Sequence, residues 1–202
     1  MRNDKMKVIG ITGGVGSGKS EVIKILSEIC NCYVLKADDL ARSLEVKGEV
    51  CYEPLVALLG KEVLDKDGQI DARKMAAAIF ADGKEDLLAK VNAIVHPAVK
   101  SRILSMIEDA RRSQKYDMFF IEAALLIEDG YDRIVDELWY IYADEDVRRK
   151  RLKESRGYSD EKISGIFESQ SSDETFRKYC KVVIDNSGDI NRTKEQLRYY
   201  CG

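Results

Sequence analysis

Histidine and proline are scarce in this chain of 202 residues, which holds one histidine, His96, and two prolines. A single imidazole excludes a metal site built from several histidines. The 5 cysteines are odd in number and none are spaced Cys-x-x-Cys, which argues against a disulfide framework and against a zinc site. We therefore expect reduced thiols and a cytoplasmic location.

Excess charge and long apolar runs are also missing. The 33 Lys and Arg residues nearly balance the 36 Asp and Glu residues, so no basic excess points to nucleic acid or an anionic membrane as a partner. No apolar run approaches the roughly 18 residues of a membrane span. The first five residues lead directly into an apolar segment, so we expect no signal peptide. The length fits one domain, as a monomer or a small homo-oligomer.

The most informative segment is the Gly-Gly-Val-Gly-Ser-Gly-Lys-Ser sequence of residues 13–20, which fits the pattern of a phosphate-binding loop. The apolar residues 6–12 before it predict a strand, and the spacing of apolar residues in 21–29 predicts a helix. This context favours nucleotide binding over an accidental glycine-rich turn. Backbone N–H groups and the helix N-terminus would bind the phosphates of ATP. The expected ATP-binding residues are Gly14, Val15, Gly16, Ser17, Gly18, Lys19 and Ser20.

Two of these residues have side-chain roles in the expected chemistry. Lys19 reaches the β- and γ-phosphates in such loops, and the Ser20 hydroxyl binds Mg²⁺. Mg²⁺ is thus the expected cofactor and ATP the expected co-substrate.

Five apolar runs with strand character alternate with helical stretches. This alternation predicts a three-layer α/β/α sandwich around a five-stranded parallel sheet. The strand-like runs are residues 7–12, 32–35, 118–121, 138–143 and 181–184.

Two insertions interrupt this pattern. About 80 residues separate the second and third runs, far more than one crossover helix needs. Residues 50–112 within that gap look helical, with breaks at Gly60, at residues 65–68 and at His96-Pro97, where we expect a helix to begin. Residues 65–68 also match the Asp-x-x-Gly of GTPases, but an ordinary turn is commoner. Residues 148–178 are polar, helical and rich in arginine, which fits a mobile lid or a solvated helical face.

Several charged residues stand where strands of such a sheet end. Asp38 follows the second run, where a carboxylate could accept a proton from a substrate hydroxyl or cap a helix over 39–46. Arg42, one turn later, faces the same crevice or is an exposed helix residue. Glu122 ends the third run and either holds Mg²⁺ through water or caps a helix. Trp139, within the fourth run, is expected in the core.

Arginines of the second insertion suit a transferring phosphoryl group, because guanidinium groups stabilise the negative charge that it spreads. The candidates are Arg148, Arg151 and Arg156, of which one or two are expected to act while the others coat a solvated helix.

An ordered set of motifs resembles the dephospho-coenzyme A kinase family almost from end to end. Residues 9–20 are similar to its opening, and residues 37–42 resemble its Asp-Ala-Asp-x-x-Ala-Arg segment. The later matches are residues 64–71 in its substrate-binding insertion, the Asn-x-x-x-His-Pro of residues 92–97, residues 125–128, Gln170 and residues 183–188.

This resemblance implies a phosphate-loop kinase fold whose core comprises residues 1–45, 113–147 and 179–202. It also implies a helical coenzyme A insertion over about 46–112 and a lid over about 148–178. The activity would be transfer of the ATP γ-phosphate to the ribose 3′-hydroxyl of dephospho-coenzyme A. Asp38 matches the catalytic base of the family, and Arg42 and His96 fall on its substrate side. Arg151 falls at its first lid arginine, and Asn186 in the segment near adenine.

Some positions depart from the family pattern. Lys36 replaces the first aspartate of the Asp-Ala-Asp motif, and Ala124 replaces a proline. Glu21 stands where threonine is common, although its backbone N–H could still bind phosphate. Arg156 follows Arg151 by five residues where four is usual.

Three alternatives remain from the sequence. The first is a nucleoside or nucleotide monophosphate kinase, which shares the core and lid but requires a nucleobase pocket. The second is a regulatory GTPase, although the chain lacks the Asn-Lys-x-Asp sequence that reads guanine. The third is a nucleotide-binding adaptor without catalysis.

Overall fold

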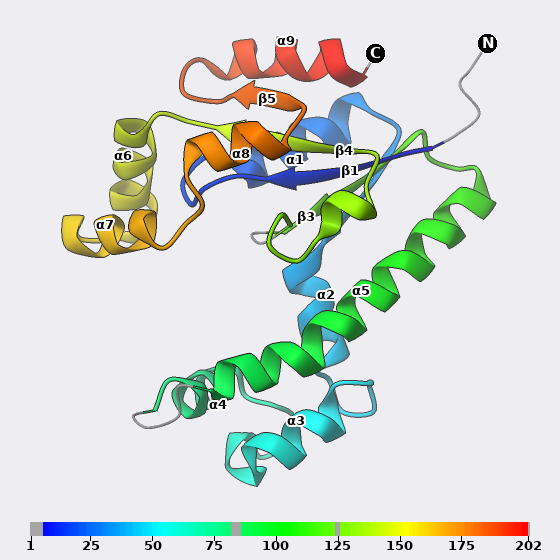
Figure 1. Ribbon diagram of the computed structural model, residues 1–202, viewed down its shortest axis with the longest axis vertical. Coiled ribbons are helices and arrows are strands. Elements are labelled where there is room, and N and C mark those ends of the chain that lie inside the picture. Colours follow the sequence, from blue (N-terminus) through cyan, green and yellow to red (C-terminus); the bar gives the residue numbers. More distant parts are fainter. Residues whose placement is uncertain (1–5, 82–85, 124–125, 202) are drawn as a thin grey trace. The chain divides into compact units, whose positions relative to one another are not determined.

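The computed structural model describes residues 6–81, 86–123 and 126–201 (Figure 1). The chain divides into two compact units, one formed by residues up to 35 together with those from 109 onward, the other by residues 36–108.

A five-stranded sheet forms the centre of the first unit, with strand order β2-β3-β1-β4-β5. Parallel pairs join β1 to β3, β1 to β4 and β4 to β5. The strands are β1 (Lys7–Thr12), β2 (Cys32–Lys36), β3 (Met118–Glu122), β4 (Glu137–Tyr142) and β5 (Val182–Asp185). These bounds lie within one residue of the runs read from the sequence, so the predicted parallel sheet is confirmed.

Alternation along the strands divides the side chains between two apolar layers. Ile9 and Ile11 of β1 and Trp139 of β4 belong to one buried cluster, together with side chains of α1 (Lys19–Ile29) and α9 (Ile190–Cys201). Trp139 is 1% exposed, which confirms its core position. On the other face, Tyr140 of β4 stacks on Phe176 of α8 (Asp173–Tyr179), with ring centroids 4.6 Å apart. Helices therefore cover both faces of the sheet, as the apolar strands require.

Two more helices follow the carboxyl end of β4. They are α6 (Glu145–Arg156) and α7 (Asp160–Glu168), which Figure 1 shows in yellow beyond the sheet. The 3-10 helix η2 (Tyr131–Arg133) lies between β3 and β4.

The second unit is helical. It holds α2 (Ala37–Leu44), α3 (Tyr52–Leu59), the 3-10 helix η1 (Lys61–Val63), α4 (Ala72–Ile79) and most of α5 (Leu87–Ser113). Helix α3 ends at Gly60, as expected. The expected turn at residues 65–68 is also present, because the Gly68 N–H donates to the Asp65 carbonyl and the Asp65 carboxylate accepts two further N–H groups. The GTPase reading of this segment is therefore unnecessary.

One helix boundary read from the sequence is wrong. Pro97 lies inside α5, ten residues after its start at Leu87, and no helix begins there. A proline inside a helix removes one hydrogen bond and crowds the preceding turn. However, Val91, Val95 and Val99 continue one buried stripe through that position. Apolar packing thus outweighs the local cost of the proline.

Gly10 in β1 is closely surrounded by apolar side chains. A Cβ atom there would lie 2.6 Å from Leu138 Cδ2 and 3.1 Å from Leu126 Cδ1. Gly10→Ala should therefore lower the free energy of unfolding by about 1–3 kcal/mol, the usual cost of overpacking. Chemical denaturation measures this change.

Gly165→Ala serves as the matched control. Gly165 lies inside α7, with open space around its ideal Cβ position. Alanine there should raise stability by about 0.5–1 kcal/mol, because glycine is the poorer helix former. If both substitutions changed stability in the same direction, the packing around Gly10 would be described incorrectly.

Candidate active site

The phosphate loop joins β1 to α1 and ends at Gly18, which precedes the first residue of the helix. Gly18 has φ 89°, a left-handed conformation that favours glycine. Its missing Cβ also leaves room for the Asn186 side-chain amide, which such an atom would strike. The strand-loop-helix context predicted from the sequence is confirmed.

The carbonyl groups of the loop are held by side chains from other segments. Arg148 Nε of α6 donates to the Val15 carbonyl at 2.9 Å. Arg151 Nη1 donates to the Ser17 carbonyl at 3.3 Å, and Asn186 Nδ2 donates to the same oxygen at 2.8 Å. Arg151 Nη1 also lies 3.5 Å from the Gly16 carbonyl. Three consecutive carbonyls are thus bound on one side of the loop.

These contacts determine where the loop amides point. In a trans peptide the C=O and the following N–H are directed oppositely, so fixing a carbonyl also fixes the next N–H. The N–H groups of Gly16, Gly18 and Ser20 have no acceptor among the residues that the structure describes. Unpaired N–H donors at a helix N-terminus are the groups that bind a polyphosphate in such loops.

Polar side chains line the same loop. Lys19 Nζ donates to the Gly13 carbonyl at 2.6 Å and lies 3.4 Å from the Gly14 carbonyl. The hydroxyl oxygens of Thr12 and Ser17 are buried and make no hydrogen bond within the described chain. The Glu21 N–H donates to the Gly18 carbonyl at 3.0 Å and so belongs to the first turn of α1.

Asn186, which follows β5, is 3% exposed, and both its side-chain amide and its backbone carbonyl form hydrogen bonds within the protein. Its Oδ1 accepts a hydrogen bond from Thr193 Oγ1 at 3.0 Å, while its Nδ2 reaches the loop. Its own carbonyl accepts from Arg151 Nη2 at 2.8 Å. One buried amide therefore links α9, the loop and α6.

Glu122 ends β3 beside the strand that leads into the loop. It pairs in register with Ile11, one residue before β1 ends. After Glu122, the next described elements are a turn at residues 126–130 and the 3-10 helix η2, whose N-cap is Gly130. The sequence alternative that Glu122 caps a helix is therefore wrong. A magnesium role for it stays a prediction.

Asp38, Arg42 and His96 belong to the second unit. Asp38 lies in the first turn of α2, which begins at Ala37 and not at Asp39, and the residue flanking the helix is Lys36. The sequence alternative that Asp38 caps a helix is therefore wrong. Asp38 and Arg42 are exposed one turn apart on the same helix, and His96 is half-buried in α5.

Comparison with known proteins is consistent with this geometry. The family model CoaE, dephospho-CoA kinase, matches residues 7–192. The curated dephospho-CoA kinase of Aquifex aeolicus is 37% identical over 193 residues, which cover 96% of this chain and 95% of the relative. The chain belongs to the dephospho-CoA kinase family.

Two further similarities agree with this assignment. The dephospho-CoA kinase of Carboxydothermus hydrogenoformans is 35% identical over 192 residues, which cover 95% of this chain and 91% of the relative. A crystal structure of TT1252 from Thermus thermophilus superposes with a TM-score of 0.79 at 28% identity, with 96% of each chain covered. The family resemblance and the phosphate-loop kinase fold predicted from the sequence are confirmed.

For some residues of this dephospho-CoA kinase family member, the contacts in the structure differ from those expected from the sequence. Arg148 and Arg151 were expected to face ATP, and the structure places both on carbonyls of the loop. Arg156 is exposed at the end of α6, near the Tyr158 ring. Ala124 and Leu125, two positions of the resemblance, lie outside the described residues.

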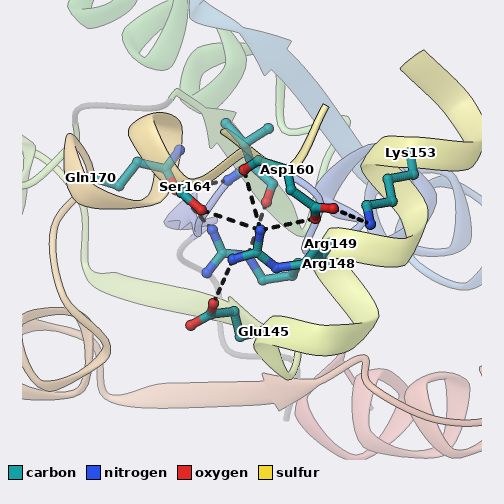
Figure 2. Close-up of polar contacts among 8 residues, drawn as sticks. Glu145, Arg148, Arg149, Lys153, Asp160, Ser164 and Gln170 are labelled. Atoms are coloured by element: carbon teal, nitrogen blue, oxygen red, sulfur yellow. Dashed lines mark hydrogen bonds and ion pairs between the residues drawn. The ribbon is translucent and has the colours of Figure 1, made fainter. Parts of the chain in front are cut away.

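Other supporting residues were missed or given no role. Thr193 is a fully buried hydroxyl on the apolar face of α9. Its spacing from Ile190 and Leu197 could have revealed a polar residue in need of a partner. Arg149 was missed because an arginine-rich sequence does not show which partner each arginine binds. Its guanidinium contacts Glu145, Asp160 and Ser164 and so links α6 to α7 (Figure 2).

Within residues 6–81, 86–123 and 126–201, no group of three or more His, Cys, Asp or Glu side chains could hold a metal ion. No helix in that part of the chain has the length and apolar character needed to cross a membrane.

Asn186→Asp should weaken the support of the loop. The carboxylate cannot donate to the Ser17 carbonyl, so the free energy of unfolding should fall by about 1–3 kcal/mol at pH 8. Burial raises the pKa of such a carboxyl, and its protonated form can donate again. The folded variant would then bind a proton more tightly than the unfolded one, so the deficit should shrink as the pH falls toward 5.

Denaturation of both proteins at pH 5 and pH 8 measures this difference. Asn191→Asp, an exposed change on α9, is the control and should cost almost nothing. Equal costs at positions 186 and 191, or a deficit at position 186 that does not depend on pH, would contradict the described contact.

Proposed function

We propose that this protein transfers the γ-phosphate of ATP to the ribose 3′-hydroxyl of dephospho-coenzyme A, giving coenzyme A and ADP. The observation that carries this proposal is the phosphate loop: side chains bind its carbonyls at residues 15–17, while the N–H groups of Gly16, Gly18 and Ser20 have no acceptor among the described residues. Membership of the dephospho-CoA kinase family supplies the acceptor. Catalysis would come mainly from positioning and electrostatics, as in other phosphoryl transfers.

Asp38 is proposed as the base that accepts the proton of the 3′-hydroxyl. Its carboxylate is exposed, with no hydrogen bond to another described residue. Such a group is available to a substrate hydroxyl. Arg42, one turn away, and His96 are proposed to bind the substrate. The insertion of about residues 46–112, which holds His96, would bind the coenzyme A precursor.

Lys19, Arg148 and Arg151 are proposed to act on ATP. Lys19 would exchange its carbonyl contacts for the β- and γ-phosphates, whose charge increases in the transition state. Residues 148–178 would act as the lid, with Arg151 stabilising the transferring group. The proposed ATP-binding backbone is that of residues 14–21, with Arg148 and Asn186 at its border.

Mg²⁺ fits the donors available beside the loop. Ser20 offers an exposed hydroxyl at the start of α1, and Glu122 offers a carboxylate at the end of the neighbouring strand. Oxygen donors of this kind suit Mg²⁺ bound largely through water. When bound, the ion neutralises phosphate charge.

An acceptor panel tests the proposed reaction. ADP release is measured with dephospho-coenzyme A, adenosine and AMP, in the presence of ATP and Mg²⁺. Release only with dephospho-coenzyme A supports the proposal, whereas release with AMP or adenosine supports the nucleotide or nucleoside kinase. Tight ATP binding without release on any acceptor would identify a non-catalytic adaptor.

Asp38→Asn should keep ATP binding and lower turnover by roughly 10²–10⁴-fold, because an amide cannot accept the hydroxyl proton. Asp39→Asn is the control, since Asp39 is also exposed in the first turn of α2. Steady-state kinetics and ATP titration measure both variants. Near-normal turnover in Asp38→Asn would remove the proposed base.

Arg151→Ala should lower turnover on the order of 100-fold, and by more than it weakens ATP affinity. Arg156→Ala, at an exposed position of the same helix, should change turnover by no more than about twofold. Amide exchange of residues 148–178 should slow when ATP and Mg²⁺ bind the wild-type protein. Unchanged kinetics in Arg151→Ala together with unchanged exchange would mean that this segment is a static surface.

A further inference from the structure

Gln170, which follows α7, makes contacts with the phosphate loop that the reaction above does not use. Its Oε1 accepts a hydrogen bond from the Val15 N–H at 3.2 Å and another from Arg148 Nη2 at 2.9 Å. Arg148 Nε in turn donates to the Val15 carbonyl at 2.9 Å. Val15, Gln170 and Arg148 thus form a closed ring of three hydrogen bonds, two of whose members are labelled in Figure 2. We call these three residues the Val15 ring.

The ring fixes both peptide groups of Val15. The peptide before it is held through the Val15 N–H, and the peptide after it through the carbonyl. Because C=O and N–H in a trans peptide point in opposite directions, the second contact sets the direction of the Gly16 N–H. That N–H is one of the donors with no acceptor among the described residues.

Arg148 is itself held firmly. Its guanidinium lies over the Phe167 ring of α7, with Cζ 4.1 Å from the ring centroid. Burial lowers the pKa of Arg148, although a guanidinium remains charged at neutral pH. Gln170 supplies an oxygen to this half-buried charge, which has no hydrogen bond to a carboxylate among the residues that the structure describes.

We propose that Gln170 is a positioning residue for phosphoryl transfer: through the Val15 ring it holds the phosphate loop in its nucleotide-binding conformation before the nucleotide arrives. Arg148 then acts on the loop backbone through Nε, while its Nη2 donates to Gln170. This role rests on the kinase reaction proposed above. Preorganisation of this kind raises nucleotide affinity, because the ordering of the loop precedes binding.

The test compares Gln170→Met with Gln170→Glu. Methionine has a similar length and no oxygen, whereas glutamate keeps acceptors for Val15 and Arg148. In Gln170→Met we expect the dissociation constant for ADP with Mg²⁺ to rise about tenfold, the equivalent of roughly 1.4 kcal/mol. Exchange of the Val15 amide, which donates to Gln170, should accelerate by a similar factor when measured by NMR without nucleotide. Gln170→Glu should keep the exchange rate of the Val15 amide near that of the wild type and retain most of the affinity for ADP.

Arg149→Met is the matched control for loss of packing in this region. Arg149 is the neighbour of Arg148 but contacts Glu145, Asp160 and Ser164 and not the loop (Figure 2). Arg149→Met should leave the exchange of the Val15 amide unchanged. Wild-type affinity and exchange in Gln170→Met, or equally faster exchange across the whole sheet, would overturn the proposal. ADP binding does not depend on the acceptor, so a wrong acceptor would leave this test intact.

Gly14 offers an independent test of the ring. A Cβ atom on Gly14 would collide with the Arg148 guanidinium. Gly14→Ala should therefore displace Arg148 and weaken ADP binding about as much as Arg148→Met does. In the Arg148→Met background the same alanine should add less than about a threefold loss, since contacting residues are non-additive. Full additivity of the two losses would show that Gly14 and Arg148 act separately and would contradict the ring.

Discussion

The direction of the peptide groups in the phosphate loop is the constraint on which the site depends. A polyphosphate needs several N–H donors aimed at one point, and an isolated loop has no reason to hold them there. Here the opposite ends of those peptides, the carbonyls of Val15, Gly16 and Ser17, are bound by side chains from α6 and by Asn186. The protein thus orients its donors by binding the acceptors behind them.

This arrangement links the site to the rest of the first unit. β1 runs between β3 and β4, so the loop begins at the centre of the sheet. α6 follows β4 and Asn186 follows β5, so parallel strands bring both to the same edge as the loop. Thr193, on the buried face of α9, holds Asn186 in turn. Sheet order, and not closeness in sequence, therefore brings residues 15–17, 148–151 and 186 together.

The sequence predicted features that depend on local pattern. Apolar runs located the strands within one residue, and the glycine-rich motif located the loop. A prediction from local propensity was wrong where tertiary packing opposes that propensity. Pro97 was interpreted as a helix start, but α5 continues past it because Val91, Val95 and Val99 form one buried stripe. Asp38 was left between two readings because N-capping depends on where the helix begins, and α2 begins one residue before it.

Contacts between distant segments could not be predicted. Nothing in an arginine-rich run shows that Arg148 binds the Val15 carbonyl while its neighbour Arg149 links two helices. Gln170 was identified only as part of a family resemblance, and its acceptor role follows from the fold. Polar partners of this kind are set by tertiary geometry, which one sequence does not display.

We propose that phosphoryl transfer from ATP occurs at this loop. This proposal is tested most directly by single-turnover conversion of dephospho-coenzyme A to coenzyme A in Lys19→Met, with product identified by mass spectrometry. Lys24→Met, at an exposed position of the same helix, is the control. We predict that the rate in Lys19→Met falls on the order of 1,000-fold or more, with the fold intact by circular dichroism, while Lys24→Met remains near wild type. A near-normal rate in folded Lys19→Met would show that phosphoryl transfer does not depend on this loop.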